Sequence, residues 1–335
     1  MNPIAIYSGS IVIYWSSIVI CAGLLASLFM ALALQSSNNE RSSGMLLFVP
    51  LMLLLAIPMC RALHWYCHTE QYASFASAIK DYSVGSYVLS AAFLAALIAA
   101  VIVKLLGLTS SAAKLLDAYA PAAALAIAFI RLSSLFNNSC RSKIIIQTPA
   151  LQQLPLASGI TTSSGNVEYR FATFFVHFIL LLVICYILLR FFGRRRNIAK
   201  AHGRAEGDTA RMFLLFYSAS EVIMDSTRYD SSFMKFNGFV SIVQIIAGVC
   251  ILALLVYHSI HSIKANGLRF YHWLAWLGFL ALLGGIGASE YLVQRHGNWY
   301  LGCYSAMAVC CLFMALLVYK VYRTCCADAR KPGKV

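Results

Sequence analysis

The sequence contains few charged residues, and few acidic ones in particular. Asp, Glu, Lys and Arg make up 11% of its 335 residues, whereas about a quarter is typical of a soluble domain. Of these charged residues, 12 are acidic and 26 are basic. The 61% content of hydrophobic residues and the mean hydropathy of +0.75 exclude an ordinary soluble domain. The sequence therefore predicts a polytopic membrane protein.

Patterns of metal ligands and of paired cysteines are also missing. The 11 cysteines are odd in number and several lie in apolar runs, so no disulfide framework is predicted. One cluster, in "CRALHWYCH", has metal-ligand chemistry and consists of Cys60, His64, Cys67 and His68. No second ligand pair follows at zinc-site spacing, which favours an interfacial belt of aromatic and histidine side chains. A haem held by His177 and His258 is disfavoured by their unmatched depths, and we predict no metal or cofactor.

Apolar runs long enough to cross a hydrocarbon core of about 30 Å recur along the chain. We expect helices, because an open sheet edge would leave backbone groups unpaired in lipid. The second and sixth runs are short and partly polar, so the predicted number is seven to nine. The runs lie at 11–34, 46–60, 84–107, 118–136, 171–192, 209–225, 237–257, 271–292 and 300–322. The prediction is an all-α polytopic membrane protein.

The runs also predict how the chain is organised. Residues 1–260 are expected to form a bundle of seven helices, and residues 261–335 an extension of about two more helices with a tail. The longest polar stretch, 137–170, contains several Pro and Gly breakers and is expected to be an external loop or small head.

Basic residues are distributed unevenly between the predicted loops. With the N-terminus outside, 17 Lys and Arg residues lie on the inner side and eight on the outer side, and Arg131 alone lies within the membrane. The positive-inside rule therefore predicts an external N-terminus and a cytoplasmic C-terminus. The basic run at 190–211 is expected to be a topology anchor beside anionic headgroups. It lacks the interleaved aromatic residues of a nucleic-acid site, so no nucleic-acid partner is predicted.

Charges inside the predicted membrane segments are candidate functional groups, because each costs on the order of 3 kcal/mol at the bilayer centre. Arg131, late in the fourth run, either faces the bundle or snorkels outward, and both interpretations stay open. In the sixth run, one helical face carries Tyr217, Glu221, Asp225 and Arg228. Such a charged face cannot be exposed to lipid. It is either a functional site or an internal network of salt bridges.

Short motifs follow one another in order between residues 12 and 257. They include "DAYAP" at 117–121, "IRLSSLFNNS" at 130–139 and "YRFATFFVH" at 169–177. The residues that carry them are Trp15, Arg61, Asp117, Arg131, Asn137, Arg170, Thr173, Tyr217, Asp225, Arg228 and Gln244. In these residues, in their order and in topology, the chain resembles the prolipoprotein diacylglyceryl transferase family of bacterial membrane enzymes.

The chain departs from the family motifs at several positions. Ser16 stands at the Tyr of the opening Trp-Tyr-Gly, while Ser134 and Ser139 replace an Asn and the Glu of the signature Gly-Arg-x-Gly-Asn-Phe-x-Asn-x-Glu. In the motif Tyr-Gly-x-x-Arg-x-x-x-Glu-x-x-Arg, Glu221 takes the place of the first Arg. In the family segment Arg-His-Pro-Thr-Gln-Leu-Tyr-Glu, apolar residues and His177 replace all but the Arg and Thr. The family's His-Gly-Gly would fall near 87–92, where "YVLSAA" has no histidine.

The resemblance implies a reaction. Family enzymes move diacylglycerol from phosphatidylglycerol to the cysteine thiol of a lipoprotein precursor, forming a thioether and releasing glycerol phosphate. Such a transfer needs a thiolate and a stabilised phosphate leaving group. The implied catalytic residues are Arg131, Tyr217, Asp225 and Arg228, with the arginines on phosphate, Tyr217 donating a hydrogen bond and Asp225 orienting Arg228. The implied substrate-binding residues are Arg61, Asn137, Glu221 and Gln244.

The net charge expected at this site leads to two hypotheses about function. Three arginines, at 61, 131 and 228, against Glu221 and Asp225 give a net charge of +1, where an Arg at 221 would give +3. One hypothesis is an active transferase of the bacterial inner membrane whose partners are phosphatidylglycerol and a lipoprotein precursor. The other, which the sequence slightly favours, is a non-catalytic paralogue that binds lipid or a partner protein.

Overall fold

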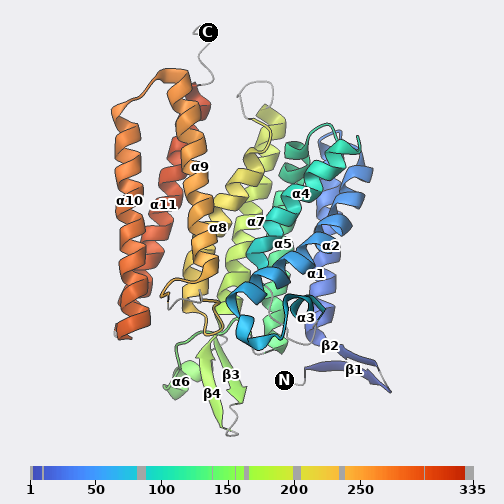
Figure 1. Cartoon of the computed structure of the whole chain (residues 1–335), viewed down its shortest axis with the longest axis vertical. Coiled ribbons are helices and arrows are strands. Elements are labelled where there is room, and N and C mark those ends of the chain that lie inside the picture. The colour runs from blue at the N-terminus through green and yellow to red at the C-terminus, as the bar shows by residue number, and fades with distance from the viewer. Residues whose placement is uncertain are drawn as a thin grey trace.

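Nine helices of 14 residues or more make up most of the part of the chain that the structure describes. That part of the protein's computed structural model comprises residues 3–9, 11–80, 88–137, 139–154, 156–161, 166–198, 205–233, 238–297 and 299–328. The helices are α1 (Trp15–Ser37), α2 (Ser42–Cys67), α4 (Ala92–Leu105), α5 (Ala112–Ser133), α7 (Thr173–Ile198), α8 (Asp208–Thr227), α9 (Ile242–Asn266), α10 (Phe270–Tyr291) and α11 (Tyr300–Asp328). They lie side by side as one bundle (Figure 1). Each corresponds to one predicted run, which confirms the all-α membrane fold.

Seven of these helices are long and apolar enough to cross a membrane. The two others are α4, which with the preceding turn spans only Leu89–Leu105, and α8, which carries the charged face. Helix α8 is surrounded by α5, α7, α9 and α11. Its charges are therefore shielded from lipid by other helices, as the sequence predicts for such a face.

Some predicted boundaries are wrong. Residues 11–14, predicted as the start of the first helix, form strand β2 (Ile11–Tyr14), which pairs antiparallel with β1 (Ile4–Ser8). Their β-branched and aromatic side chains suit a strand, and a partner strand is available. Helix α2 is longer than its predicted run 46–60, because Arg61 and His64 end the apolar pattern in sequence but are buried in the structure. The first residues of the predicted run 84–107 and the end of the C-terminal tail lie outside the described residues.

The predicted external loop, 137–170, carries a second hairpin. Strands β3 (Ala157–Thr161) and β4 (Val167–Phe171) pair antiparallel, and the short helix α6 (Pro149–Gln152) precedes them. This hairpin lies at the same end of the bundle as β1 and β2 (Figure 1). Isolated bridges join Ser142 to Arg228 and Ile145 to Arg170. The loop is thus fastened to the end of α8.

Helix α5 lies at the centre of the bundle, between α1, α7 and α8. Its buried residues are mostly alanines, among them Ala118, Ala122, Ala124 and Ala128. Small side chains let helix backbones approach closely in membranes, where packing rather than water exclusion drives association. The close packing of α5 with α7 and α8 brings the end of α5, with Arg131, beside the charged face of α8.

The C-terminal helices α10 and α11 are fastened to α8 at both of its ends. Tyr322 on α11 donates a hydrogen bond of 3.1 Å to Asp208 Oδ2 at the start of α8. At the other end, Ser226 donates to Glu290 of α10, and Tyr304 Oη of α11 lies 3.4 Å from the Ser226 carbonyl. The end of α11 and strand β1 lie at opposite ends of the bundle (Figure 1). Which end faces the cytoplasm stays a prediction.

Candidate functional site

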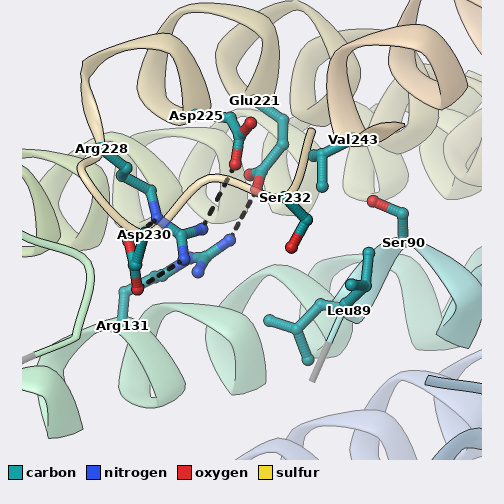
Figure 2. A pocket seen from close by; sticks show the side chains of 10 residues that line it. Leu89, Ser90, Arg131, Glu221, Asp225, Arg228, Asp230, Ser232 and Val243 are labelled. Carbon is teal, nitrogen blue, oxygen red and sulfur yellow. Dashed lines mark hydrogen bonds and ion pairs between the residues drawn. The ribbon is translucent and has the colours of Figure 1, made fainter. Parts of the chain in front are cut away.

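The charged face of α8 ends in a small cavity (Figure 2). Arg131, Glu221, Asp225, Arg228 and Asp230 are the charged residues that line it, and the volume of the cavity is about 30 Å³. Since one water molecule needs about 10–15 Å³, the cavity has room for a few waters. It is much smaller than a phospholipid headgroup.

Arg131 points into the bundle. Its Nη2 lies 2.6 Å from Glu221 Oε1, and its Nη1 donates to Cys140 Sγ at 3.3 Å. The arginine side chain is 5% exposed and that of the glutamate 3%. The snorkelling interpretation of Arg131 is therefore wrong, because helices α7 and α8 cover the side chain and offer it a buried partner.

Glu221 joins three helices. Its second carboxylate oxygen, Oε2, lies 3.3 Å from Nε2 of His177 on α7, and Tyr217 interacts with both Glu221 and Arg131. His177 is 1% exposed. Sequence reasoning considered this histidine only as a haem ligand. His258 instead contacts the ring of Tyr322 near the start of α8, so the two histidines lie near opposite ends of that helix and the haem alternative is wrong.

Arg228 reaches the cavity from outside the helix. Helix α8 ends at Thr227, and Arg228 has an extended backbone with φ −77° and ψ 143°. Its Nε and Nη2 donate to the two carboxylate oxygens of Asp230 at 2.9 and 3.1 Å, and its Nη1 lies 3.5 Å from Asp225 Oδ1. Three of the four residues predicted on one helical face are thus on α8, and the fourth approaches from its C-cap. Asp230 was missed because no helical periodicity relates it to the others.

Asp230 is ionised under ordinary conditions. Its burial acts to raise the pKa of the carboxyl group, but Arg228 and the backbone N–H of Cys140 hold that pKa below its usual value. The Cys140 N–H donates to Asp230 Oδ2 at 3.1 Å, and Cys140 itself has a φ of +55°. The loop after α5 is therefore fixed to the loop after α8 across the site.

Gln244 supports the site from the start of α9. Ser241 donates to Asp225 with its hydroxyl and caps α9 by accepting from the Gln244 N–H at 3.1 Å. Gln244 Oε1 accepts from the Ser241 N–H at 2.9 Å, and its Nε2 donates to the Val222 carbonyl at 3.1 Å. The amide of Gln244 is thus engaged by protein groups on both sides, and it holds Ser241 against Asp225.

Three predicted substrate-binding residues, Gln244 among them, do not line this cavity. Arg61 is buried between α2 and the short helix α3 (Phe75–Lys80), where its Nε donates to the Ala78 carbonyl at 3.1 Å. Asn137 accepts from the Ser139 N–H at 3.0 Å in the turn after α5. The predicted net charge of +1 is therefore wrong for the lining. Two arginines face three carboxylates there, and the formal net charge is −1.

The cysteine and histidine cluster of α2 has ordinary contacts. The rings of His64 and His68 stack at 4.4 Å, and His64 Nδ1 lies 3.0 Å from the Tyr72 hydroxyl. Among the described residues, no group of three or more His, Cys, Asp or Glu side chains is arranged to hold a metal ion. The aromatic and histidine interpretation fits these contacts.

The comparisons with known proteins agree with the motifs. The family model of prolipoprotein diacylglyceryl transferase matches residues 3–256. The chain belongs to the prolipoprotein diacylglyceryl transferase family. The phosphatidylglycerol–prolipoprotein diacylglyceryl transferase of Streptococcus mutans serotype c is 23% identical over 259 residues, which cover 76% of this chain and 95% of the relative. The family prediction is thereby confirmed, and the protein is a multi-pass bacterial membrane protein. Helices α10 and α11 lie beyond the residues that the family model matches.

The contact between His177 and Glu221 joins positions that belong to two different family motifs. Counted from Arg170, His177 stands at the last position of the family segment Arg-His-Pro-Thr-Gln-Leu-Tyr-Glu, where the family has an acid. Glu221 stands where the transferase motif has a base. The two side chains lie 3.3 Å apart. The resemblance therefore implies that acidic and basic residues are exchanged between these two positions.

The stretch in which the resemblance places the family's His-Gly-Gly also reaches the cavity. Val88, Leu89 and Ser90 line it, on and just before the 3-10 turn Leu89–Ala91. None of the described lining residues is a histidine, and residue 87 lies outside the described residues.

Proposed function

We propose that this protein binds the headgroup of a membrane phospholipid between Arg131 and Arg228 and transfers its diacylglyceryl group to a cysteine thiol of a lipoprotein precursor. The observation that carries the proposal is the convergence of these two arginines on one cavity. They come from different family motifs and are far apart in the sequence. Phosphatidylglycerol, the lipid in the name of the Streptococcus mutans relative, is the first donor to test.

In the proposed reaction, the arginines and the carboxylates of the site have different roles. The thiol sulfur attacks the glycerol carbon that carries the phosphate, the C–S bond forms as the C–O bond breaks, and glycerol phosphate leaves with the bonding electrons. Arg131 and Arg228 offset the charge that develops on the leaving phosphate, which is commonly the largest catalytic contribution. A carboxylate of the lining accepts the thiol proton.

For a lipid to bind in this way, both arginines must exchange a carboxylate partner for the phosphate of the lipid. Arg131 is held by Glu221 at 2.6 Å and Arg228 by Asp230 at 2.9 Å, so a phosphate replaces carboxylates at both arginines. Side chains such as Leu89 and Ser232 must also move, because the cavity has room for only a few waters. A charge-assisted hydrogen bond to phosphate is about as strong as one to carboxylate, which makes the exchange feasible.

The second candidate is a non-catalytic membrane protein in which the same charges hold helices together. The observation that favours it is that carboxylates of the chain itself form ion pairs with both arginines. Breaking a buried pair by removing one partner costs about 3–5 kcal/mol. A network that joins α5, α7 and α8 in this way has a structural use without any substrate.

Transfer of a labelled diacylglyceryl group to a lipoprotein precursor, measured in membranes depleted of the host's own enzyme, tests both candidates. The wild-type protein should form the thioether product, and Arg228→Gln should reduce its rate at least 100-fold, in line with the loss of one transition-state contact. Arg190→Gln is the matched control, because Arg190 contacts Tyr186 on α7 away from the cavity. Lipid binding without transfer would favour the second candidate. Absence of both would refute the first.

A further inference from the structure

The lining of the cavity carries more negative than positive charge. Arg131 and Arg228 face Glu221, Asp225 and Asp230, which gives a formal net charge of −1. The phosphate of phosphatidylglycerol would add a further negative charge among carboxylates in a medium of low dielectric constant, where such repulsion is strong. A headgroup that brings one positive charge together with its phosphate avoids this cost.

Acidic and basic groups also alternate at short range within the cavity. Arg131 Nη2 lies 2.6 Å from Glu221 Oε1, and Arg228 Nε lies 2.9 Å from Asp230 Oδ1 (Figure 2). A ligand that carries a phosphate and an ammonium group two carbons apart can enter such a pair. Its phosphate takes the place of the carboxylate at the arginine, and its ammonium takes the place of the arginine at the carboxylate. Each of these buried charges then keeps a partner of opposite sign.

Glu221 offers a buried acceptor to such an ammonium. Its Oε2 makes no hydrogen bond of ordinary geometry with the part of the chain that the structure describes, although His177 Nε2 lies 3.3 Å away. An ammonium has three donors and no acceptor. It can therefore bond to this oxygen and to the hydroxyl oxygens of Ser90 and Ser232, which line the same cavity. The hydroxyl groups of a glycerol headgroup carry no charge to match a carboxylate.

We infer that the headgroup selected by this site is zwitterionic, with a phosphate held by Arg131 and Arg228 and a primary ammonium held by Glu221 and Asp230, as in phosphatidylethanolamine. The inference rests on the proposed function, because it assigns the lipid class of the same site. Glu221 supplies at the cavity the buried carboxylate that an ammonium requires.

The test is lipid retention by the purified full-length protein, measured by native mass spectrometry. The delipidated protein is offered equimolar phosphatidylethanolamine, phosphatidylglycerol and phosphatidylcholine with the same acyl chains. We expect phosphatidylethanolamine to be retained about tenfold over phosphatidylglycerol, the ratio that one charge-assisted hydrogen bond supplies. Phosphatidylcholine should be retained less than phosphatidylethanolamine, because its quaternary nitrogen donates no hydrogen bond.

Variants test whether the lipid preference depends on the carboxylates of the cavity or on the loss of any negative charge. Glu221→Gln should reduce the preference for phosphatidylethanolamine about tenfold. Asp230→Asn is the second variant, because Asp230 lies at the cavity rim with a side chain 27% exposed, and its loss is easier for the fold to tolerate. Glu206→Gln is the matched control, since Glu206 pairs with Lys114 away from this cavity. It removes the same charge and should leave the preference unchanged.

The outcomes also separate this inference from the proposed function. Retention of phosphatidylglycerol over or equal to phosphatidylethanolamine overturns the inference and leaves phospholipid binding intact. A preference that persists in both Glu221→Gln and Asp230→Asn also overturns it, because the ammonium is then not bound by these carboxylates. If none of the three lipids is retained, both the inference and the proposed function fail.

Discussion

The two ends of α8 carry buried polar clusters that differ in how their carboxylates are used. At the start of the helix, Asp117 accepts from the N–H groups of Gly207 and Ala210 at 2.7 and 3.0 Å, and Asp208 accepts from Tyr322. At the other end, Glu221, Asp225 and Asp230 contact arginine side chains around a cavity. The first cluster satisfies helix N–H groups that have no other partner. The second pairs carboxylates with the side chains of arginines, whose place a charged ligand would have to take.

Burial and charge alone therefore do not identify a binding site. Both clusters are buried and both contain an Arg–Asp contact, Arg211 with Asp208 at one end and Arg228 with Asp230 at the other. They differ in their partners. Backbone donors fix a carboxylate to one geometry, whereas guanidinium groups leave it free to accept a new cation.

Replacing Arg131 should have the largest effect on stability. Arg131→Leu leaves Glu221 buried without its partner at 2.6 Å, and the free energy of unfolding should fall by about 3–5 kcal/mol. Thermal unfolding in detergent measures the loss. Arg141→Leu, in the loop 137–170 rather than in the helices, is the comparison variant, and its loss should be smaller. An unchanged melting temperature for Arg131→Leu would contradict the structural role of the pair.

Replacing Glu221 by the arginine of the family motif tests the exchanged pair. Glu221→Arg places three arginines and His177 together in low dielectric, and we expect the free energy of unfolding to fall by about 3 kcal/mol. Adding His177→Glu restores the family polarity and should recover 1–3 kcal/mol, the usual coupling of contacting residues. The double variant should also retain more phosphatidylglycerol. Additive losses in a double-mutant cycle would mean that the two residues are not an exchanged pair.

Parts of this site could be predicted from the sequence, and the reason differs for each residue. The periodicity of α8 predicts that Tyr217, Glu221 and Asp225 share a buried face, because a charged face cannot contact lipid. Arg61 was wrongly grouped with them. Its position at the end of an apolar run is the same whether it faces the site or, as in the structure, helix α3. Local pattern does not tell which neighbour a helix end will have.

Contacts between distant segments were the least predictable. His177 and Glu221 belong to different helices, and no local pattern in the sequence relates them. The fold itself was predicted well, because nine apolar runs allow few alternatives to nine helices in lipid. The hairpin of β1 and β2 was missed. Its residues are as apolar as the helix that follows, and hydropathy does not separate them.

Replacing Asp117 should have an intermediate effect. Asp117→Ala removes the acceptor of two N–H groups at the start of α8, and we expect a loss of about 2 kcal/mol in the free energy of unfolding. Because this end of the helix has no exchangeable ion pair at the cavity, the folded variant should retain phospholipid as the wild type does. Loss of lipid retention beyond the unfolded fraction would show that the two ends of α8 are not independent.

The smallest expected effect is the pH dependence contributed by Asp230. Arg228 holds the pKa of this carboxyl group below its usual value despite burial. A group whose pKa is lower in the folded state stabilises the fold above its unfolded pKa of about 3.9, and that contribution is lost as the pH falls through the folded pKa. It should amount to about 1 kcal/mol, because the Asp230 side chain is 27% exposed and its pairing is partly screened.

The measurement for Asp230 is a difference between proteins, since other groups titrate in the same range. Asp230→Asn should melt below wild type at pH 7, and the gap should shrink as the pH falls below about 4, where the wild-type carboxyl group begins to protonate. Glu206→Gln, whose side chain is 45% exposed, should show a smaller gap at pH 7. A gap for Asp230→Asn that stays constant down to the lowest pH at which the protein folds would mean that the ionised carboxylate is not what Arg228 requires. The protonated carboxyl group would then serve as well as the ionised one, and the contact at the cavity would resemble the fixed contacts at the start of α8.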